Sequence, residues 1–135
     1  MRYEPHKDEV AAVPTMTDEE LLEYFLYRIF ETDEVWGLKA DGQWQARQWQ
    51  DKETLVVWPY KRYAEDAATG DWAQSIPIAE SVETFTYQIL NSSARANRMI
   101  EIMPRVSDVG CLISPQRLFN MLENMMEARE CNIGD

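Results

Sequence analysis

The strongest constraint on the fold is a continuous apolar run, Thr54-Leu55-Val56-Val57-Trp58, which ends at Pro59. A strand with one face in water alternates apolar and polar residues, whereas a strand covered on both faces reads as an unbroken apolar segment. The run therefore predicts a strand that lies between two packed layers. A chain of 135 residues is long enough for one hydrophobic core, so we expect one domain with helices packed on a sheet.

The first regular element is predicted from a helix-capping motif at Thr17-Asp18-Glu19-Glu20. In such a capping box the threonine hydroxyl accepts from the amide three residues on, and the glutamate reaches back to the threonine amide. An apolar stripe at helical spacing follows and predicts a helix at residues 18–31. The stripe consists of Leu22, Phe25, Leu26 and Ile29. Residues 1–16 contain two prolines and no such periodicity, so we expect a flexible acidic arm there.

A hairpin is predicted where two apolar-rich segments, residues 34–39 and 43–49, flank an Asp-Gly pair. A two-residue turn would place Leu38 opposite Gln45. A three-residue loop would place Leu38 opposite Trp44 and Trp36 opposite Ala46. The second register collects the apolar residues on one face, and we prefer it because register follows the buried face.

The rest of the chain alternates between helical and extended segments. These are a helix at 60–69 that Gly70 ends, an extended stretch at 76–78, a helix from Ser81, strands at 99–103 and 109–113, and a last helix opened by Ser114 and Pro115. The order α-β-β-β-α-α-β-β-α predicts an α+β fold, with a mainly antiparallel sheet of about five strands and helices packed against it. We expect this domain at residues 17–130, with a tail at 131–135.

The net charge of the chain limits the classes of partner that it is expected to bind. The formal net charge is −11, and residues 1–34 carry ten acidic residues against three basic ones. Such a chain repels phosphate backbones, so we expect no nucleic-acid binding. The acidic segment has two interpretations, a solvated face or a docking surface for a basic partner. No apolar stretch approaches the ~20 residues of a membrane span and no signal peptide is evident, so we expect a cytoplasmic protein without membrane contact.

The residues needed for common catalytic or metal sites are missing or isolated. His6 is the one histidine and lies in the predicted arm, where we expect a structural or incidental role. Cys111 and Cys131 form no metal-binding or redox spacing, and we expect reduced thiols. No glycine-rich phosphate loop occurs. We therefore expect no catalytic residue, cofactor or metal, although acids such as Glu34, Glu53 or Glu101 leave a carboxylate-based site open.

Aromatic residues are the most unusual feature, with five tryptophans in 135 residues. Three of them lie on predicted strands and are assigned to the core: Trp36, Trp44 and Trp58. Trp49 ends its strand beside Arg47, and Trp72 follows the glycine that ends a helix. With Tyr60 and Tyr63, these two are the candidates for an exposed aromatic patch that binds a protein partner.

Several short motifs stand in order along residues 21–126. They are Thr32-Asp33-Glu34-Val35-Trp36-Gly37-Leu38, Leu55-Val56-Val57-Trp58-Pro59 with Tyr63-Ala64-Glu65, Gly70-Asp71-Trp72, Ile78 with Phe85, and Ser114-Pro115 with Leu118. Together they resemble the bacterial family catalogued as domain of unknown function 2750. The resemblance implies the element order above and a bacterial cytosolic setting, and it transfers no catalytic or binding residue.

These observations favour a non-enzymatic protein-binding or regulatory module, such as an immunity-like partner of another protein. The alternative is a small-molecule-binding protein or an enzyme with a carboxylate-based site. A third hypothesis is that the acidic face mimics a nucleic acid. The sequence does not predict the oligomeric state.

Overall fold

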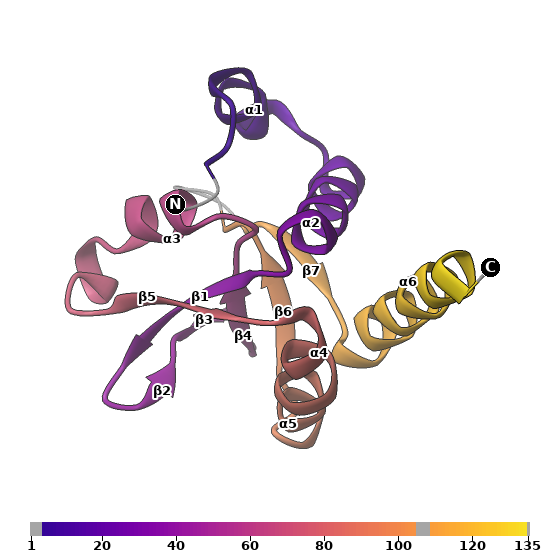
Figure 1. The fold of residues 1–135 in the computed structure, drawn as a ribbon. Coiled ribbons are helices and arrows are strands. Elements are labelled where there is room, and N and C mark those ends of the chain that lie inside the picture. The colour runs from indigo at the N-terminus through magenta and orange to yellow at the C-terminus, as the bar shows by residue number, and fades with distance from the viewer. Residues whose placement is uncertain (1–3, 105–108, 135) are drawn as a thin grey trace.

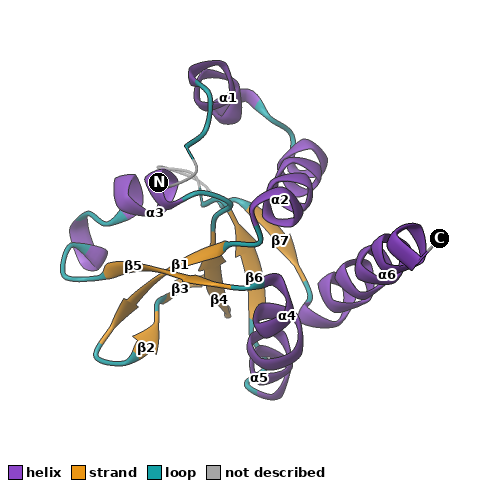
Figure 2. Cartoon of the chain, in the orientation of Figure 1, coloured by secondary structure: helices purple, strands orange, loops and turns teal. Residues whose placement is uncertain are grey.

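The computed structural model describes residues 4–104 and 109–134 (Figure 1). In these residues seven strands form two sheets, with the orders β2-β1-β5 and β3-β4-β6-β7. Helices pack against both sheets, as Figure 2 shows, and this arrangement confirms the α+β class. The strands are β1 (Val35–Ala40), β2 (Gln43–Trp44), β3 (Ala46–Trp49), β4 (Lys52–Val57), β5 (Ile76–Glu80), β6 (Met99–Ile102) and β7 (Cys111–Ile113).

The helical elements include three short or irregular turns. The α-helices are α1 (Lys7–Ala12), α2 (Asp18–Thr32), α3 (Lys61–Ala67), α4 (Val82–Thr84), α5 (Leu90–Arg95) and α6 (Pro115–Gly134). The turns are η1 (Val13–Thr15), η2 (Gly70–Trp72) and the wider π-helical η3 (Phe85–Ile89), which joins α4 to α5. Because α6 continues to Gly134, it includes most of the segment expected to be a tail.

The predicted N-terminal arm contains a helix that the sequence analysis did not anticipate. His6 caps α1, since its Nδ1 accepts from the Asp8 amide at 3.2 Å and its own amide donates to Glu9 Oε2. Histidine is not among the preferred capping residues, so the sequence does not predict the start of α1 at His6. Glu9 also accepts from Arg28 Nε at 2.7 Å, so α1 is tied to α2. His6 thus has a structural role, as expected.

Helix α2 begins and packs as predicted. Thr17 Oγ1 accepts from the Glu20 amide at 3.1 Å, and the Thr17 amide donates to Glu20 Oε1 at 2.9 Å. The bonds from the backbone and hydroxyl of Thr17 lower the pKa of Glu20. Phe25, on the apolar stripe, is fully buried and meets Phe85 of η3 edge-to-face at 6.5 Å between ring centroids.

The preferred hairpin register is wrong, and the two-residue turn is the one that forms. Lys39 pairs with Trp44, and the two turn residues have positive φ, 53° at Asp41 and 77° at Gly42. Trp44 is not left in water by this register, because its ring covers Gly37. A Cβ atom placed on Gly37 would lie 2.4 Å from Trp44 Cζ3. Because Gly37 has no side chain, the Trp44 ring packs on its backbone and is half-buried in the observed register.

The second arm of the hairpin also divides between the two sheets. The Gln45 amide still donates to the Leu38 carbonyl at 2.7 Å, and the chain then leaves β1. From Ala46 onward it pairs with β4 instead, in the antiparallel register Ala46 to Leu55. The predicted strand at 43–49 is therefore two short strands, β2 and β3, with a bend at Gln45.

Strand β4 lies inside the structure, as its apolar run predicts. Val56 and Val57 are fully buried, with antiparallel β3 on one side and parallel β6 on the other. Trp58 extends β4 by a bridge to Trp36, with backbone N–H···O distances of 2.8 and 2.9 Å in the two directions. This bridge connects the two sheets. The stretch at 76–78 forms β5, which pairs antiparallel with β1 and completes the smaller sheet.

Candidate functional site

The carboxylate of Glu101 on β6 is fully buried, with 0% of the residue exposed. Arg47 on β3 contacts it with two guanidinium nitrogens, Nε to Oε1 at 2.9 Å and Nη2 to Oε2. Thr54 Oγ1 donates to Oε1 at 2.8 Å and the Gly110 amide donates to Oε2 at 2.9 Å. Both carboxylate oxygens are thus satisfied, and this four-residue network joins β3, β4, β6 and the start of β7.

Trp49 supports the arginine of this network. Residues two apart on a strand lie on the same face, and the Arg47 guanidinium carbon lies 5.5 Å from the centroid of the Trp49 ring. The network and the ring hold Arg47 from two sides, and its side chain is 25% exposed. These contacts restrain the Arg47 side chain, which forms part of the wall of a neighbouring surface.

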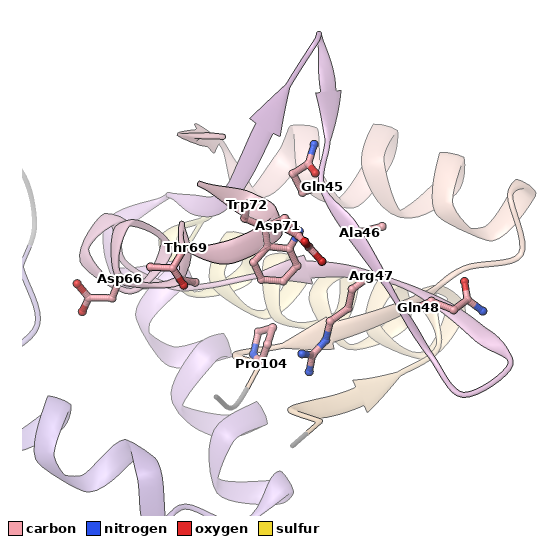
Figure 3. A pocket seen from close by; sticks show the side chains of 10 residues that line it. Gln45, Ala46, Arg47, Gln48, Asp66, Thr69, Asp71, Trp72 and Pro104 are labelled. Carbon is pink, nitrogen blue, oxygen red and sulfur yellow. The ribbon is translucent and has the colours of Figure 1, made fainter. Parts of the chain in front are cut away.

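That surface is a groove of about 670 Å³ between β3 and the α3–η2 segment. Its lining residues include Gln45, Arg47, Asp66, Asp71, Trp72 and Pro104. In Figure 3 the Trp72 ring and Asp71 lie across from β3, and Pro104 lies beside the Arg47 side chain. We define these residues, with Ala46, Gln48, Ala67 and Thr69, as the β3 groove.

The β3 groove has an acidic character despite its arginine. The Arg47 charge is offset by Glu101, with which it forms the bidentate pair. Asp71 is exposed on the opposite wall beside Trp72, whereas the exposed Asp66 lies at the far end of the groove and points away from β3 (Figure 3). Arg62 lies 4.0 Å from Asp66 and offsets part of its charge, so Asp71 is the main source of negative charge beside Trp72. The groove therefore favours cationic groups.

One wall of the groove is the edge of a sheet. β3 is the terminal strand in the order β3-β4-β6-β7. Its partner β4 follows through a two-residue turn, so the pairs Trp49–Lys52 and Arg47–Thr54 exchange backbone hydrogen bonds. The alternate residues, Ala46 and Gln48, direct their N–H and C=O groups away from β4. Both residues line the groove.

The structure separates the four aromatic residues that the sequence singles out. Trp72 is half-buried in the β3 groove and packs edge-to-face on Trp58, with 6.1 Å between ring centroids. Trp49 is half-buried under Arg47. Tyr60 is only 4% exposed, so it adds nothing to an exposed patch, and Tyr63 is half-buried. The two tyrosines lie together, away from the groove lining.

Tyr60 and Tyr63 belong to a cluster that fastens α3 to α2. The Tyr63 and Tyr24 hydroxyls are 2.9 Å apart, and the rings of Tyr60 and Tyr63 are 6.1 Å apart. Burial, reinforced by the charge of Glu9, raises the pKa of Tyr60 to about 12. Burial and the hydrogen bond with Tyr63 also raise the pKa of Tyr24. The cluster stabilises the fold in its protonated form.

Several acids of the N-terminal segment accept hydrogen bonds within the described part of the chain. Two of these bonds join separate elements, namely Arg28 to Glu9 between α2 and α1, and Val82 to Asp33. Asp33 Oδ1 accepts from the Val82 amide at 3.0 Å, and Glu34 Oε1 accepts from Trp36 Nε1 at 3.1 Å. The other acceptors are Glu20 and Glu31.

In the part of the chain that the structure describes, no three His, Cys, Asp or Glu side chains are grouped so that they could hold a metal ion. No helix within residues 4–104 and 109–134 is long and apolar enough to cross a bilayer. Cys111 is buried on β7 as predicted, and the side chain of Cys131 lies outside the described residues.

Sequence reasoning named Trp72 but missed the rest of the groove. Arg47 and Glu101 are separated by 54 positions, so no local pattern pairs them. The sequence does single out Glu101, because its carboxylate interrupts the apolar strand segment Met99-Ile100-Glu101-Ile102-Met103. Such a group requires a cationic or hydrogen-bonding partner. Only the pairing of β3, β4 and β6 in the sheet identifies that partner as Arg47.

Comparison with known protein families identifies the family of this chain. The family model described as a protein of unknown function (DUF2750) covers residues 22–122, which is most of the chain and includes the network and the groove. No curated protein matches the chain. The matched span begins in α2 and ends in α6, as the ordered motifs in the sequence indicate. The chain therefore belongs to the DUF2750 family.

Proposed function

We propose that this protein is a non-enzymatic binding module whose β3 groove captures a basic segment of a protein partner. The observation that carries the proposal is the composition of the groove, in which half-buried Trp72 and exposed Asp71 lie across from a sheet edge and a second exposed aspartate, Asp66, lies at the far end (Figure 3). Tryptophan supplies contact area at low entropic cost and attracts cations to its ring face. The aspartates add charge complementarity and steer the encounter.

The rigidity of both walls supports this function. On one side, Arg47 is fixed by Glu101 and Trp49. On the other, Trp72 is fixed by its edge-to-face contact with Trp58. A preorganised site loses little conformational entropy when it binds, and this improves affinity for a given contact area.

The carboxylates of this region are better suited to recognition than to proton transfer. Glu101 is buried, but its oxygens already accept four hydrogen bonds. Asp66 and Asp71 are exposed to water, whereas general acids and bases are usually tuned by burial. We therefore favour binding over a carboxylate-based reaction. The isolated cysteines suit a reducing compartment, and we place the module in the cytoplasm.

A display library of random twelve-residue peptides tests the proposal. The immobilised protein is expected to enrich peptides that are rich in Lys and Arg. Synthetic copies of these peptides should bind the Asp66→Asn/Asp71→Asn variant at least about tenfold more weakly, since both changes remove charge from the groove wall. The measurement is the Kd by isothermal calorimetry at an ionic strength of about 0.15 M.

The matched control is Glu83→Gln/Glu127→Gln, which makes the same change in net charge at exposed positions outside the groove. It is expected to bind within about twofold of the wild type, because screening weakens charges that lie beyond a Debye length of ~8 Å. A library that enriches no basic peptide contradicts the proposal. Equal losses in the two double variants would also contradict it, since the attraction would then be non-specific.

A further inference from the structure

We propose that the partner segment binds as an extended strand added to the outer edge of β3, with a basic side chain over Trp72 and beside Asp71 (Figure 3). The inference rests on the proposed function and specifies the conformation and chemistry of the ligand.

The backbone of β3 is oriented to receive a strand. In the antiparallel pairing with β4, the N–H and C=O groups of Ala46 and Gln48 point outward. They offer two donors and two acceptors along one edge of the groove. An extended peptide satisfies such groups by main-chain hydrogen bonds and places alternate side chains in adjacent pockets.

The side-chain contacts follow from the two-residue period of a strand. Side chains of the added segment point to opposite faces in turn, so every second one faces the wall formed by α3 and η2. Asp66 comes from α3, and Asp71 and Trp72 come from η2. A Lys or Arg at that position lies beside the Asp71 carboxylate and next to the Trp72 ring (Figure 3), whereas an acidic side chain is repelled.

The charge of the chain selects a basic partner over a second copy of the protein. Pairing β3 with its counterpart in another molecule brings together two chains that each carry a net charge of −11. It also places the same two aspartates on both sides of the interface. A basic strand has neither disadvantage, so we commit to a cationic segment of a different protein.

The length of the edge limits the size of the contact. β3 has four residues, and two of them point their backbone outward. The recognised core of the partner is therefore about four residues long, because one added residue pairs with each residue of β3. We expect a short motif in which basic residues alternate with residues of any type.

The test is an N-methyl scan of the most enriched peptide of the display selection, made as synthetic twelve-residue copies. Each copy carries one methyl group on a backbone nitrogen within the basic core. Methylation removes the N–H donor and blocks the approach of a neighbouring strand. The expected result is a period-two pattern, with at least about tenfold losses in Kd at alternate positions and less than about twofold losses between them.

A variant pair tests the same contact from the side of the protein. Proline is tolerated at strand edges where its missing N–H would face solvent, so Gln48→Pro removes one outward donor and obstructs the edge. We expect this variant to lose at least about tenfold in affinity, while Gln48→Thr retains binding within about twofold. Thermal unfolding of both variants shows whether the fold is intact. If Gln48→Pro does not fold, the peptide scan alone decides.

The outcomes separate this inference from the proposed function. A basic peptide that binds in the groove and tolerates methylation at every position overturns the added strand, and leaves the binding module in place. A library without basic binders overturns both. A competing result, self-association of the protein through β3, would appear as a dimer in analytical ultracentrifugation that Gln48→Pro abolishes, and it too would overturn the inference.

Discussion

Arg47 and Glu101 are 54 positions apart in the sequence, yet the guanidinium of one contacts both carboxylate oxygens of the other. The pair crosses the central strand β4 and fixes the wall of the β3 groove. Breaking a buried ion pair by removing one partner is costly, because the remaining charge is left without compensation. Several consequences of this arrangement can be measured.

Replacing Glu101 by glutamine is expected to destabilise the protein by about 3 kcal/mol. The substitution keeps the shape of the side chain but removes the charge that offsets Arg47, and its amide nitrogen cannot accept from the Gly110 amide. Urea unfolding followed by circular dichroism gives the free energy of unfolding.

Glu53→Gln provides the matched control for this loss. Glu53 pairs with Arg98 in an exposed position, with side chains 46% and 31% exposed. Water screens such a pair, so we expect a loss below about 1 kcal/mol. Similar losses in the two variants would show that burial does not distinguish these ion pairs, and would contradict the role given to Glu101.

Gly110→Ala is expected to destabilise the protein more than Gly37→Ala. A Cβ on Gly110 would lie 2.4 Å from the Ile102 carbonyl oxygen and 2.6 Å from that of Met103, so the backbone would have to move. On Gly37 the Cβ meets the Trp44 ring, a side chain that can rotate away at the cost of exposure. We expect about 3 kcal/mol for Gly110→Ala and about 1 kcal/mol for Gly37→Ala. The reverse order in urea unfolding would refute this account of the two glycines.

Stability is expected to fall at alkaline pH through the tyrosine cluster. The pKa of Tyr60 is raised to about 12 in the folded protein, against about 10 in an unfolded chain. The folded state therefore favours the protonated phenol. This contribution is fully present below about pH 10 and is lost as the pH rises to about 12. The urea midpoint, measured between pH 9 and pH 11.5, should decline over this window.

The variant Tyr60→Phe should show a shallower decline over the same window, because it removes one phenol that resists ionisation in the folded state. Tyr27→Phe is the control, since Tyr27 is 65% exposed and its loss leaves the cluster intact. Its decline should match that of the wild type. Equal slopes for all three proteins would exclude Tyr60 as a source of the pH dependence.

Local signals in the sequence predict most of the helices and strands, although not α1. The capping box at Thr17 and Glu20 marks the start of α2, and the apolar run predicts the buried strand β4, because each depends on neighbouring residues. The three-residue hairpin loop predicted from the sequence is wrong. Trp44 is shielded from water by packing on Gly37 of the neighbouring strand, which the pattern within one strand does not indicate. The division at Gln45 was missed for a similar reason, since the strand exchanges β1 for β4 as its partner.

The candidate site was less accessible to sequence reasoning than the fold. Trp72 was singled out by its type and position after Gly70, and it does line the β3 groove. Its neighbours Arg47 and Asp66 come from segments that meet only when β3 and α3 are in place. Tyr60 was singled out on the same grounds as Trp72, but the contact between α2 and α3 buries it.

The most direct measurement of the central claim is amide hydrogen exchange by NMR, with and without a saturating basic peptide. In the free protein the amides of Arg47 and Trp49 should already be protected by β4, whereas those of Ala46 and Gln48 should exchange faster. The account predicts that peptide binding slows exchange at Ala46 and Gln48 by at least about tenfold. Binding of the peptide with no change at these two amides would contradict it.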